Sequence, residues 1–97
     1  MATFITLSRW TQKGIENLKE SPARLDKSKE LFTSVGAEVK AFYMVTGRYD
    51  MITVIEAPDY ETVAKLTLST GSKGTIRTEI LGAFTEDEYR KIIAALP

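Results

Sequence analysis

The order in which strand-like and helix-like segments follow one another most constrains what this chain of 97 residues can fold into. Side chains alternate between two faces in the segments 2–9, 38–46, 49–57 and 75–84, which is the period of a β-strand. Helical spacing separates the first strand from the second and the third from the fourth, and it returns at the C-terminus. The order is therefore β-α-β-β-α-β plus a C-terminal helix, which predicts an α+β domain with the ferredoxin-like split βαβ arrangement. The length allows one domain, so we expect residues 1–97 to form it.

Capping signals predict where the helices begin and end, and Thr11 is expected to cap the helix after the first strand. Ser21 followed by Pro22 predicts a helix start with Ser21 as its N-cap, and Gly36 suits the left-handed end of that helix. Thr85 and Glu88 have the spacing of a capping box before the last helix. The helix that follows Pro58 and Asp59 is expected to turn one face to the core, made of Val63, Ala64, Thr67 and Leu68.

The strands are apolar on both faces, which is unusual for a sheet covered on one side. Two right-handed crossovers place both main helices on the same face of a four-stranded antiparallel sheet. In the second strand Val39, Ala41, Tyr43 and Val45 are expected on one face and Lys40, Phe42 and Met44 on the other, before a tight turn at Gly47-Arg48. A large bare apolar face is rare on a monomer. We therefore predict a homodimer, a dimeric α+β barrel in which two sheets pack about a two-fold axis, with higher oligomers left open.

Composition excludes several classes of function. The chain has no cysteine and no histidine, so thiolate chemistry, thiolate-bound metals, histidine bases and histidine-ligated haem are absent. We expect neither a metal nor a cofactor. Lys and Arg number 13 against 13 Asp and Glu, and this zero net charge argues against a nucleic-acid partner. No apolar run approaches the roughly 20 residues of a membrane span, and no signal peptide is apparent, so we expect a cytoplasmic protein without a membrane partner.

Several short motifs resemble one protein family. They are Thr46–Asp50, which contains Gly-x-Tyr-Asp, the following strand Met51–Asp59, and the stretches Thr11–Ile15, Ser21–Arg24 and Gly74–Glu79. Together, and in this order over nearly the whole chain, they are similar to the GYD domain family, which is named for the Gly-x-Tyr-Asp segment. The resemblance implies a ferredoxin-like subunit that dimerises into an α+β barrel. It does not imply an activity.

Tyr49 and Asp50 are the candidate catalytic residues, because a phenol and a carboxylate can exchange protons with a substrate. Alternatively, Tyr49 packs and Asp50 fastens the hairpin or a helix N-terminus. Adjacent strand residues point to opposite faces, so both side chains would share one cavity only at a bulge. If Asp50 is buried it needs a partner, for which Arg24 and Lys13 are the basic residues we expect.

The turn from the first strand into the first helix forms a second candidate site. Backbone N–H groups at a helix N-terminus attract anions, Gly14 would allow close approach, and Lys13 would add charge. The alternative is a capped helix with a surface lysine and a packed tryptophan. The candidate ligand-binding residues are Trp10, Thr11, Lys13, Gly14, Arg24 and Asp50.

Three functions remain open at this point. The first is a small-molecule-binding or regulatory module with a pocket between sheet and helices. The second is a cofactor-independent enzyme, such as an oxygenase or isomerase, which the fold hosts elsewhere. The third is an assembly protein whose product is the oligomer itself. An enclosed polar pocket that contains Asp50 with Arg24 or Lys13 would favour the first two functions, and a dry, filled interior would favour the third.

Overall fold

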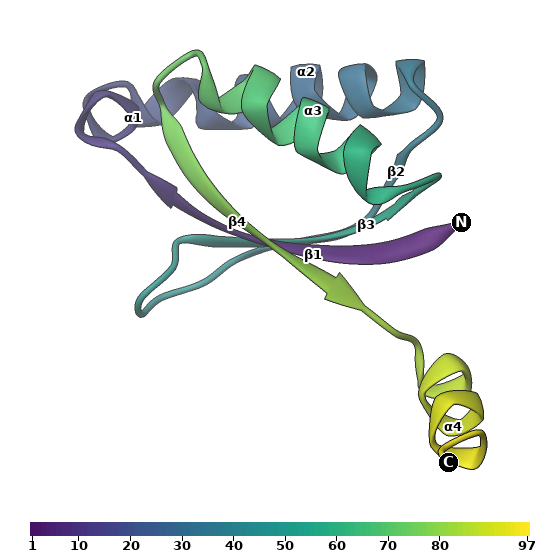
Figure 1. Cartoon of the computed structure of the whole chain (residues 1–97). Coiled ribbons are helices and arrows are strands. Elements are labelled where there is room, and N and C mark those ends of the chain that lie inside the picture. Colours follow the sequence, from purple (N-terminus) through teal and green to yellow (C-terminus); the bar gives the residue numbers. More distant parts are fainter.

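A four-stranded antiparallel sheet organises the chain in the computed structural model, which describes all 97 residues (Figure 1). The elements are β1 (Ala2–Trp10), α1 (Gln12–Glu16), the 3-10 turn η1 (Leu18–Glu20), α2 (Ser21–Ser34), β2 (Glu38–Met44), β3 (Met51–Ala57), α3 (Tyr60–Gly71), β4 (Ile76–Ala83) and α4 (Glu86–Ala94). The strand order across the sheet is β2-β3-β1-β4, with every neighbouring pair antiparallel. The ferredoxin-like α+β fold expected from the sequence is confirmed.

The helices α2 and α3 lie side by side on one face of the sheet, and the opposite face has no helix over it (Figure 1). The core fills the space between these two helices and one half of the sheet; it consists of Phe4, Phe32, Ala37, Ile55, Ala57, Val63 and Leu66. Along β1 the buried residues are Phe4, Thr6 and Ser8, which shows that every second side chain faces the helices. The inward row therefore changes from apolar to polar along the strand.

Most of the capping signals act as expected. Thr11 caps α1 and accepts a hydrogen bond from the Gly14 N–H at 3.2 Å, Gly36 adopts φ 81°, and the capping box of Thr85 and Glu88 is complete. The predicted N-cap at Ser21 is wrong by one residue. Glu20 occupies the cap position without a side-chain hydrogen bond, because η1 leads directly into α2 and the backbone is already helical at Ser21.

The strand β2 corrects two expectations. A bulge between Val39 and Ala41 puts Val39 opposite Ile55 on the helix side, whereas Tyr43 lies opposite Ile52 on the open side. Val39 and Tyr43 were expected on the same face, and the extra residue at the bulge separates them. The turn at Gly47 has the expected positive φ, 134°, but β2 ends at Met44 and β3 begins at Met51, so residues 45–50 form a longer loop than a tight hairpin needs.

The helix α3 turns a different row to the core than expected. Leu66 is 3% exposed and Leu68 is 74% exposed, so the placement of Leu68 on the buried face is wrong. Val63 and Leu66 are the buried residues of α3, and Thr67 and Thr70 follow on the same side. The helix therefore puts an apolar row over the core and hydroxyl groups next to it.

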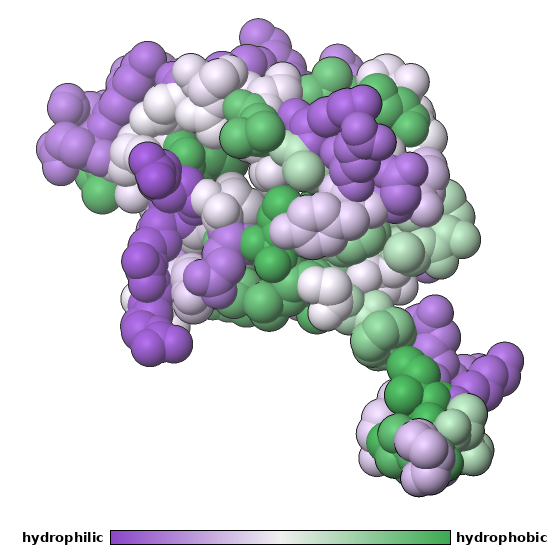
Figure 2. Space-filling view, viewed as in Figure 1, coloured by the Kyte–Doolittle hydropathy of each residue, from purple (hydrophilic) through white to green (hydrophobic).

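Much apolar surface stays uncovered in the single chain. Only 12 of the 97 residues are buried. Tyr43 and Leu81 are exposed on the helix-free side of the sheet, and Figure 2 shows hydrophobic surface there and on α4. The helix α4 stands away from the sheet at the end of β4 (Figure 1), and Tyr89, Ile92, Ile93 and Leu96 are all exposed. None of the helices has the length and apolar character that crossing a membrane requires.

Candidate functional site

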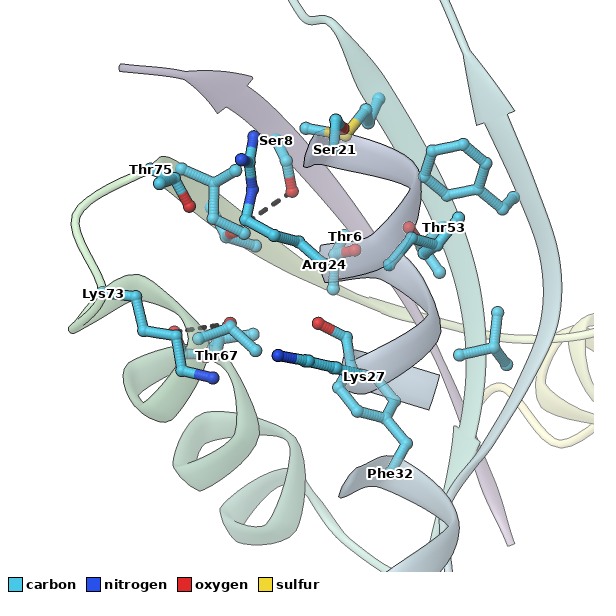
Figure 3. A pocket seen from close by; sticks show the side chains of 18 of the residues that line it. Thr6, Ser8, Ser21, Arg24, Lys27, Phe32, Thr53, Thr67, Lys73 and Thr75 are labelled. Atoms are coloured by element: carbon cyan, nitrogen blue, oxygen red, sulfur yellow. Dashed lines mark hydrogen bonds between the residues drawn. The ribbon is translucent and has the colours of Figure 1, made fainter. Parts of the chain in front are cut away.

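A cavity of about 220 Å³ lies between the sheet and the helices α2 and α3, beside the core (Figure 3). Nine hydroxyl side chains line it: Thr6, Ser8, Ser21, Ser28, Thr53, Thr67, Thr70, Thr75 and Thr78. Eight of the 20 lining residues are hydrophobic: Trp10, Leu25, Phe32, Val39, Phe42, Met51, Ile55 and Ile76. The expectation of a pocket between sheet and helices therefore has a structural counterpart.

The strand register explains why the space is hollow. Thr6 lies opposite Thr53, and Ser8 lies opposite Thr78, so three neighbouring strands contribute small polar side chains at two successive inward positions of β1. Phe4 and Ile55 occupy the adjacent level and pack under the helices. Because hydroxyl side chains are shorter than the aromatic and aliphatic groups of the core, they leave room below α2 and α3.

The charged residues around the cavity are all basic. Arg24 and Lys27 come from α2, and Lys73 comes from the turn after α3; no Asp or Glu is among the 20 lining residues. Figure 3 shows the guanidinium of Arg24 beside Ser8 and Thr75. The ammonium groups of Lys27 and Lys73 point toward one another between the helices (Figure 3). The cavity thus carries positive charge without an internal counter-charge.

Two nitrogen atoms on the cavity residues are buried without a hydrogen-bond partner in the protein. Arg24 Nη1 donates to the Asn17 carbonyl at 2.9 Å, but Arg24 Nη2 has no partner. The indole Nε1 of Trp10 is the second such atom. Leaving a buried donor unpaired costs about 1–3 kcal/mol, so a ligand that supplies acceptors to these N–H groups would gain binding free energy.

Trp10 and Arg24 are the two predicted ligand-binding residues that line the cavity. Asp50 does not line it; its Oδ2 accepts a hydrogen bond from the backbone N–H of Trp10 at 3.0 Å. The pairing of Asp50 with Arg24 or Lys13 is therefore wrong. Arg24 donates to the Asn17 carbonyl, and Lys13 Nζ donates to the Lys73 carbonyl at 3.1 Å. The donor to the Asp50 carboxylate is instead the backbone N–H of Trp10 at the end of β1.

Tyr49 also lies outside the cavity. Its hydroxyl donates to Glu79 Oε2 at 3.2 Å, and the Arg9 guanidinium lies 4.7 Å from the centre of its ring. Arg9 and Glu79 belong to the helix-free side of the sheet, so Tyr49 and Asp50 act on different parts of the molecule. The structure does not bring the two catalytic candidates together.

The start of α1 is packed against the loop before β4. The Thr11 hydroxyl donates to the Gly74 carbonyl at 2.5 Å, and the Thr11 N–H donates to the Thr75 carbonyl at 3.0 Å. A Cβ atom on Gly14 would lie 2.2 Å from the Thr75 carbonyl oxygen. The close approach that Gly14 permits is therefore that of Thr75. Thr11, Lys13 and Gly14 hold the wall of the cavity in place without lining it.

None of the nine hydroxyl residues was among the candidates from the sequence, and neither were the lysines Lys27 and Lys73. One signal was present in the strands. Thr6, Ser8, Thr53 and Thr78 all fall on the alternation that includes the core residues Phe4 and Ile55, so polar residues interrupt inward rows. The lysines carried no such signal, because surface helices are normally rich in lysine.

A family model described as the GYD domain matches residues 4–93 of the chain. The chain belongs to the GYD domain family. This confirms the family expected from the Gly-x-Tyr-Asp segment and the accompanying motifs.

One relative and two solved structures indicate how this GYD domain compares with known proteins. A Thermus thermophilus protein named "Glutamine synthetase and cystathionine beta-lyase binding protein" is 42% identical over 84 residues, which cover 86% of this chain and 88% of the relative. A feast or famine regulatory protein from M. tuberculosis complexed with L-methionine has a TM-score of 0.63 at 17% identity, with 90% of this chain and 54% of that chain covered.

The second solved structure is a 5-chloro-2-hydroxyhydroquinone dehydrochlorinase from Burkholderia phenoliruptrix complexed with 2,5-dihydroxybenzoquinone. Its TM-score is 0.62 at 12% identity, and 90% of this chain and 97% of that chain are covered. At these identities both structures show that the fold is shared.

Proposed function

We propose that this GYD domain protein is a homodimeric module that binds a small molecule in the cavity between sheet and helices. The observation that carries the proposal is the pair of buried, unpartnered donors, Arg24 Nη2 and Trp10 Nε1, on residues that line the cavity. A structural core rarely keeps such groups, because each one costs stability. Their placement around a hollow space supports binding more than a purely structural role.

A regulatory role suits this site better than the oxygenase or isomerase alternative. No carboxylate lines the cavity, and Tyr49 and Asp50 lie elsewhere. A relative with 42% identity is named for binding two enzymes, which also supports a role in binding. We therefore infer that the ligand acts as a signal, and that its binding alters contacts of the module with a protein partner.

A thermal-shift screen of metabolites tests the binding function. A ligand that binds only the folded protein stabilises it by about 2.7 kcal/mol at a hundredfold excess over Kd, so hits raise the melting temperature. We would include quinols, phenolic acids and amino acids in the screen. Failure of every compound to raise the melting temperature contradicts the proposal.

Two variants of α2 connect the screen to the cavity. Ser28→Phe places a large side chain at a lining position and should abolish the shift. Ser34→Phe is the matched control, because Ser34 is an exposed residue at the end of α2 that does not line the cavity. A ligand response that survives in Ser28→Phe would place binding elsewhere on the protein.

The helix-free side of the sheet is the surface we propose for the dimer, and we define it as the open face. Its centre is apolar and consists of Ile5, Leu7, Tyr43, Ile52, Val54 and Leu81. Arg9 and Arg77 are paired at one end, and Glu38 and Glu56 are paired at the other. A two-fold axis parallel to the sheet and perpendicular to the line that joins these two ends would place the basic end of one copy against the acidic end of its partner. This complementarity supports a second copy as the occupant.

The helix α4 supports the same dimer. Its capping box and the ion pair of Arg90 with Glu86, at 2.7 Å, stabilise the helix locally, yet its apolar residues Ile92 and Ile93 are 43% and 50% exposed. An amphipathic helix needs a partner for its apolar stripe. We infer that α4 packs against the partner copy at the edge of the open face.

Light scattering after size exclusion tests the dimer. We expect twice the 10.8 kDa chain mass at micromolar concentration, and we expect Val54→Glu on the open face to lower it to the mass of one chain. Val35→Glu on the helix side is the control and should leave the dimer intact. A species of 10.8 kDa for the unmodified chain would contradict the proposal.

A further inference from the structure

We propose that the cavity ligand is a small carboxylic acid, with its carboxylate at Arg24 and Trp10 and its apolar part directed toward Phe32. This inference rests on the proposed binding function and specifies the ligand class. The charge, the hydrogen-bond donors and the size of the cavity support it.

The charge of the lining selects for an anion. Arg24, Lys27 and Lys73 contribute positive charge, and none of the lining residues is acidic. Lys27 and Lys73 face one another from α2 and the turn after α3 (Figure 3), so an anion between them would be attracted by both. A cationic ligand would be repelled by both. A neutral ligand would leave the positive charge uncompensated.

The unpartnered donors select for an acceptor. Arg24 Nη2 and Trp10 Nε1 carry hydrogen atoms and cannot accept a hydrogen bond. They belong to the same end of the cavity, because Arg24 lies beside Thr75 (Figure 3) and the residue after Trp10 bonds the Thr75 carbonyl at 3.0 Å. A carboxylate offers two acceptor oxygens, and its hydrogen bonds with arginine are about twice as strong as neutral ones.

The remaining lining determines the rest of the ligand. Phe32, Phe42, Met51 and Ile55 present apolar surface in the same cavity, which favours an acid with an apolar body over an inorganic oxyanion. The volume of about 220 Å³ is below the roughly 300–1,000 Å³ of pockets for drug-sized ligands. The ligand is therefore a small acid, and the hydroxyls of Thr6, Thr53 and Thr67 can bind polar substituents on it.

Calorimetric titrations with a matched series of probes test this inference. Benzoate, benzamide and benzylamine share one ring and differ in charge, and inorganic phosphate is an anion without an apolar part. We expect benzoate to bind at least about tenfold more tightly than each of the others, a difference of about 1.4 kcal/mol. Raising the salt concentration should weaken benzoate binding and leave benzamide binding unchanged.

Variants of arginine assign the carboxylate site. Arg24→Gln should weaken benzoate binding about tenfold or more without a change for benzamide, and Arg24→Lys, which keeps the charge, should recover part of the affinity. Arg48→Gln in the exposed loop 45–50 is the control and should bind benzoate normally. Circular dichroism verifies that each variant is folded.

The possible outcomes separate this inference from the proposed function. If benzamide or benzylamine binds as tightly as benzoate, the inference that the site selects a carboxylate is wrong, and small-molecule binding still holds. If phosphate binds as tightly as benzoate, the inference that the ligand has an apolar part is wrong. If no probe binds at millimolar concentration and the thermal-shift screen finds only ligands without a carboxylate, the acid is wrong and the proposed function is right. A carboxylic acid among the hits supports the acid. If the screen also finds no ligand, both fail.

Discussion

Gly14 connects the first helix to the wall of the cavity. Its Cα faces the Thr75 carbonyl so closely that a Cβ would lie 2.2 Å from the oxygen. Thr75 is itself buried, and its backbone accepts the N–H of Thr11, so neither side can move freely. The helix, the loop before β4 and the cavity wall are therefore one packed unit.

Gly14→Ala should lower the free energy of unfolding by about 1–3 kcal/mol, because the added methyl group must displace backbone. Gly82→Ala is the matched control, since a Cβ there would meet nothing within 4 Å and its φ is not positive. We expect Gly82→Ala to leave the free energy unchanged or to raise it by up to about 1 kcal/mol. Urea unfolding at one protein concentration measures both, and equal losses would contradict the packing account.

The contacts of Asp50 support a structural role. Its side chain accepts the Trp10 N–H, its N–H donates to the Ser8 carbonyl at 2.9 Å, and its carbonyl accepts the Val45 N–H at 2.8 Å. It thereby closes the loop 45–50 onto the end of β1. The alternative in which Asp50 fastens the hairpin agrees with these bonds.

Asp50→Ala should lower the free energy of unfolding by about 1–3 kcal/mol, because a hydrogen bond to a charged acceptor is lost. Asp50→Asn keeps one acceptor oxygen and should lose less. Neither variant should change the ratio of benzoate to benzamide affinity, since Asp50 does not line the cavity. A collapse of that ratio with unchanged stability would indicate a functional carboxylate instead.

Single residues were predictable where a local rule applied and not where contacts span the chain. Thr11, Gly36 and Thr85 were identified from caps that involve neighbours within a few residues. The partner of Asp50 is 40 positions away in sequence, and which basic or backbone donor reaches it depends on how the loop folds over β1. Trp10 and Arg24 were named as candidates, but their common cavity is formed only by the packed sheet and helices.

At the scale of elements, two helix caps make the stability sensitive to acid. The hydroxyl and the backbone N–H of Thr62 donate to Asp59 Oδ1 and lower the pKa of Asp59 below its usual 3.8. The backbone and side chain of Thr85 likewise lower the pKa of Glu88 below 4.5. A carboxylate with a lowered pKa in the folded state stabilises the fold above its unfolded pKa, and this contribution is lost as the pH falls through the folded pKa.

Asp59→Asn should therefore reduce the acid sensitivity. Asparagine still caps a helix but does not titrate, so stability near pH 7 should change little. The loss of stability from about pH 5 to about pH 3 should be smaller than in the unmodified chain. Thermal unfolding across this range measures the effect, with Asp26→Asn on the exposed side of α2 as the control. An unchanged pH profile would contradict the capping explanation.

The helix α4 has a specific role in the proposed dimer. Ile92→Gln combined with Ile93→Gln should raise the dimer dissociation constant at least about tenfold, because two apolar side chains lose their burial. Lys91→Gln is the control, because Lys91 is an exposed residue on the side of α4 opposite the apolar stripe. It should leave the dimer dissociation constant unchanged. Sedimentation equilibrium measures both constants. A dimer unaffected by the double change would show that α4 lies outside the interface.

Element order and most boundaries followed from periodicity and caps, whereas two details depended on tertiary structure. The bulge in β2 left no mark in the alternation of residues 38–46, because both faces of that strand are apolar. Leu68 was placed on the buried face because Val63, Ala64, Thr67 and Leu68 form a helical row. In the structure α3 is oriented so that Leu66 packs in the core and Thr67 borders the cavity.

At the scale of the whole molecule, the sheet separates the surfaces of the two proposed functions. One face supports a core and a basic, hydroxyl-lined cavity, and the open face carries the apolar surface proposed for the dimer. The sequence predicted two apolar faces and a second copy. It did not predict that half of the inward face is polar, because threonine is common in strands and a single one does not indicate a cavity.

The most direct test of this account follows the indole N–H of Trp10, the only tryptophan, in proton–nitrogen correlation spectra during a benzoate titration. We expect this signal to shift progressively and saturably together with the amide signals of Ser8 and Thr75. In Arg24→Gln, which binds benzoate about tenfold more weakly or worse, it should shift much less at the same benzoate concentrations. A titration in which Trp10 stays fixed, or in which only signals of the open face move, would contradict a ligand site between the sheet and the helices.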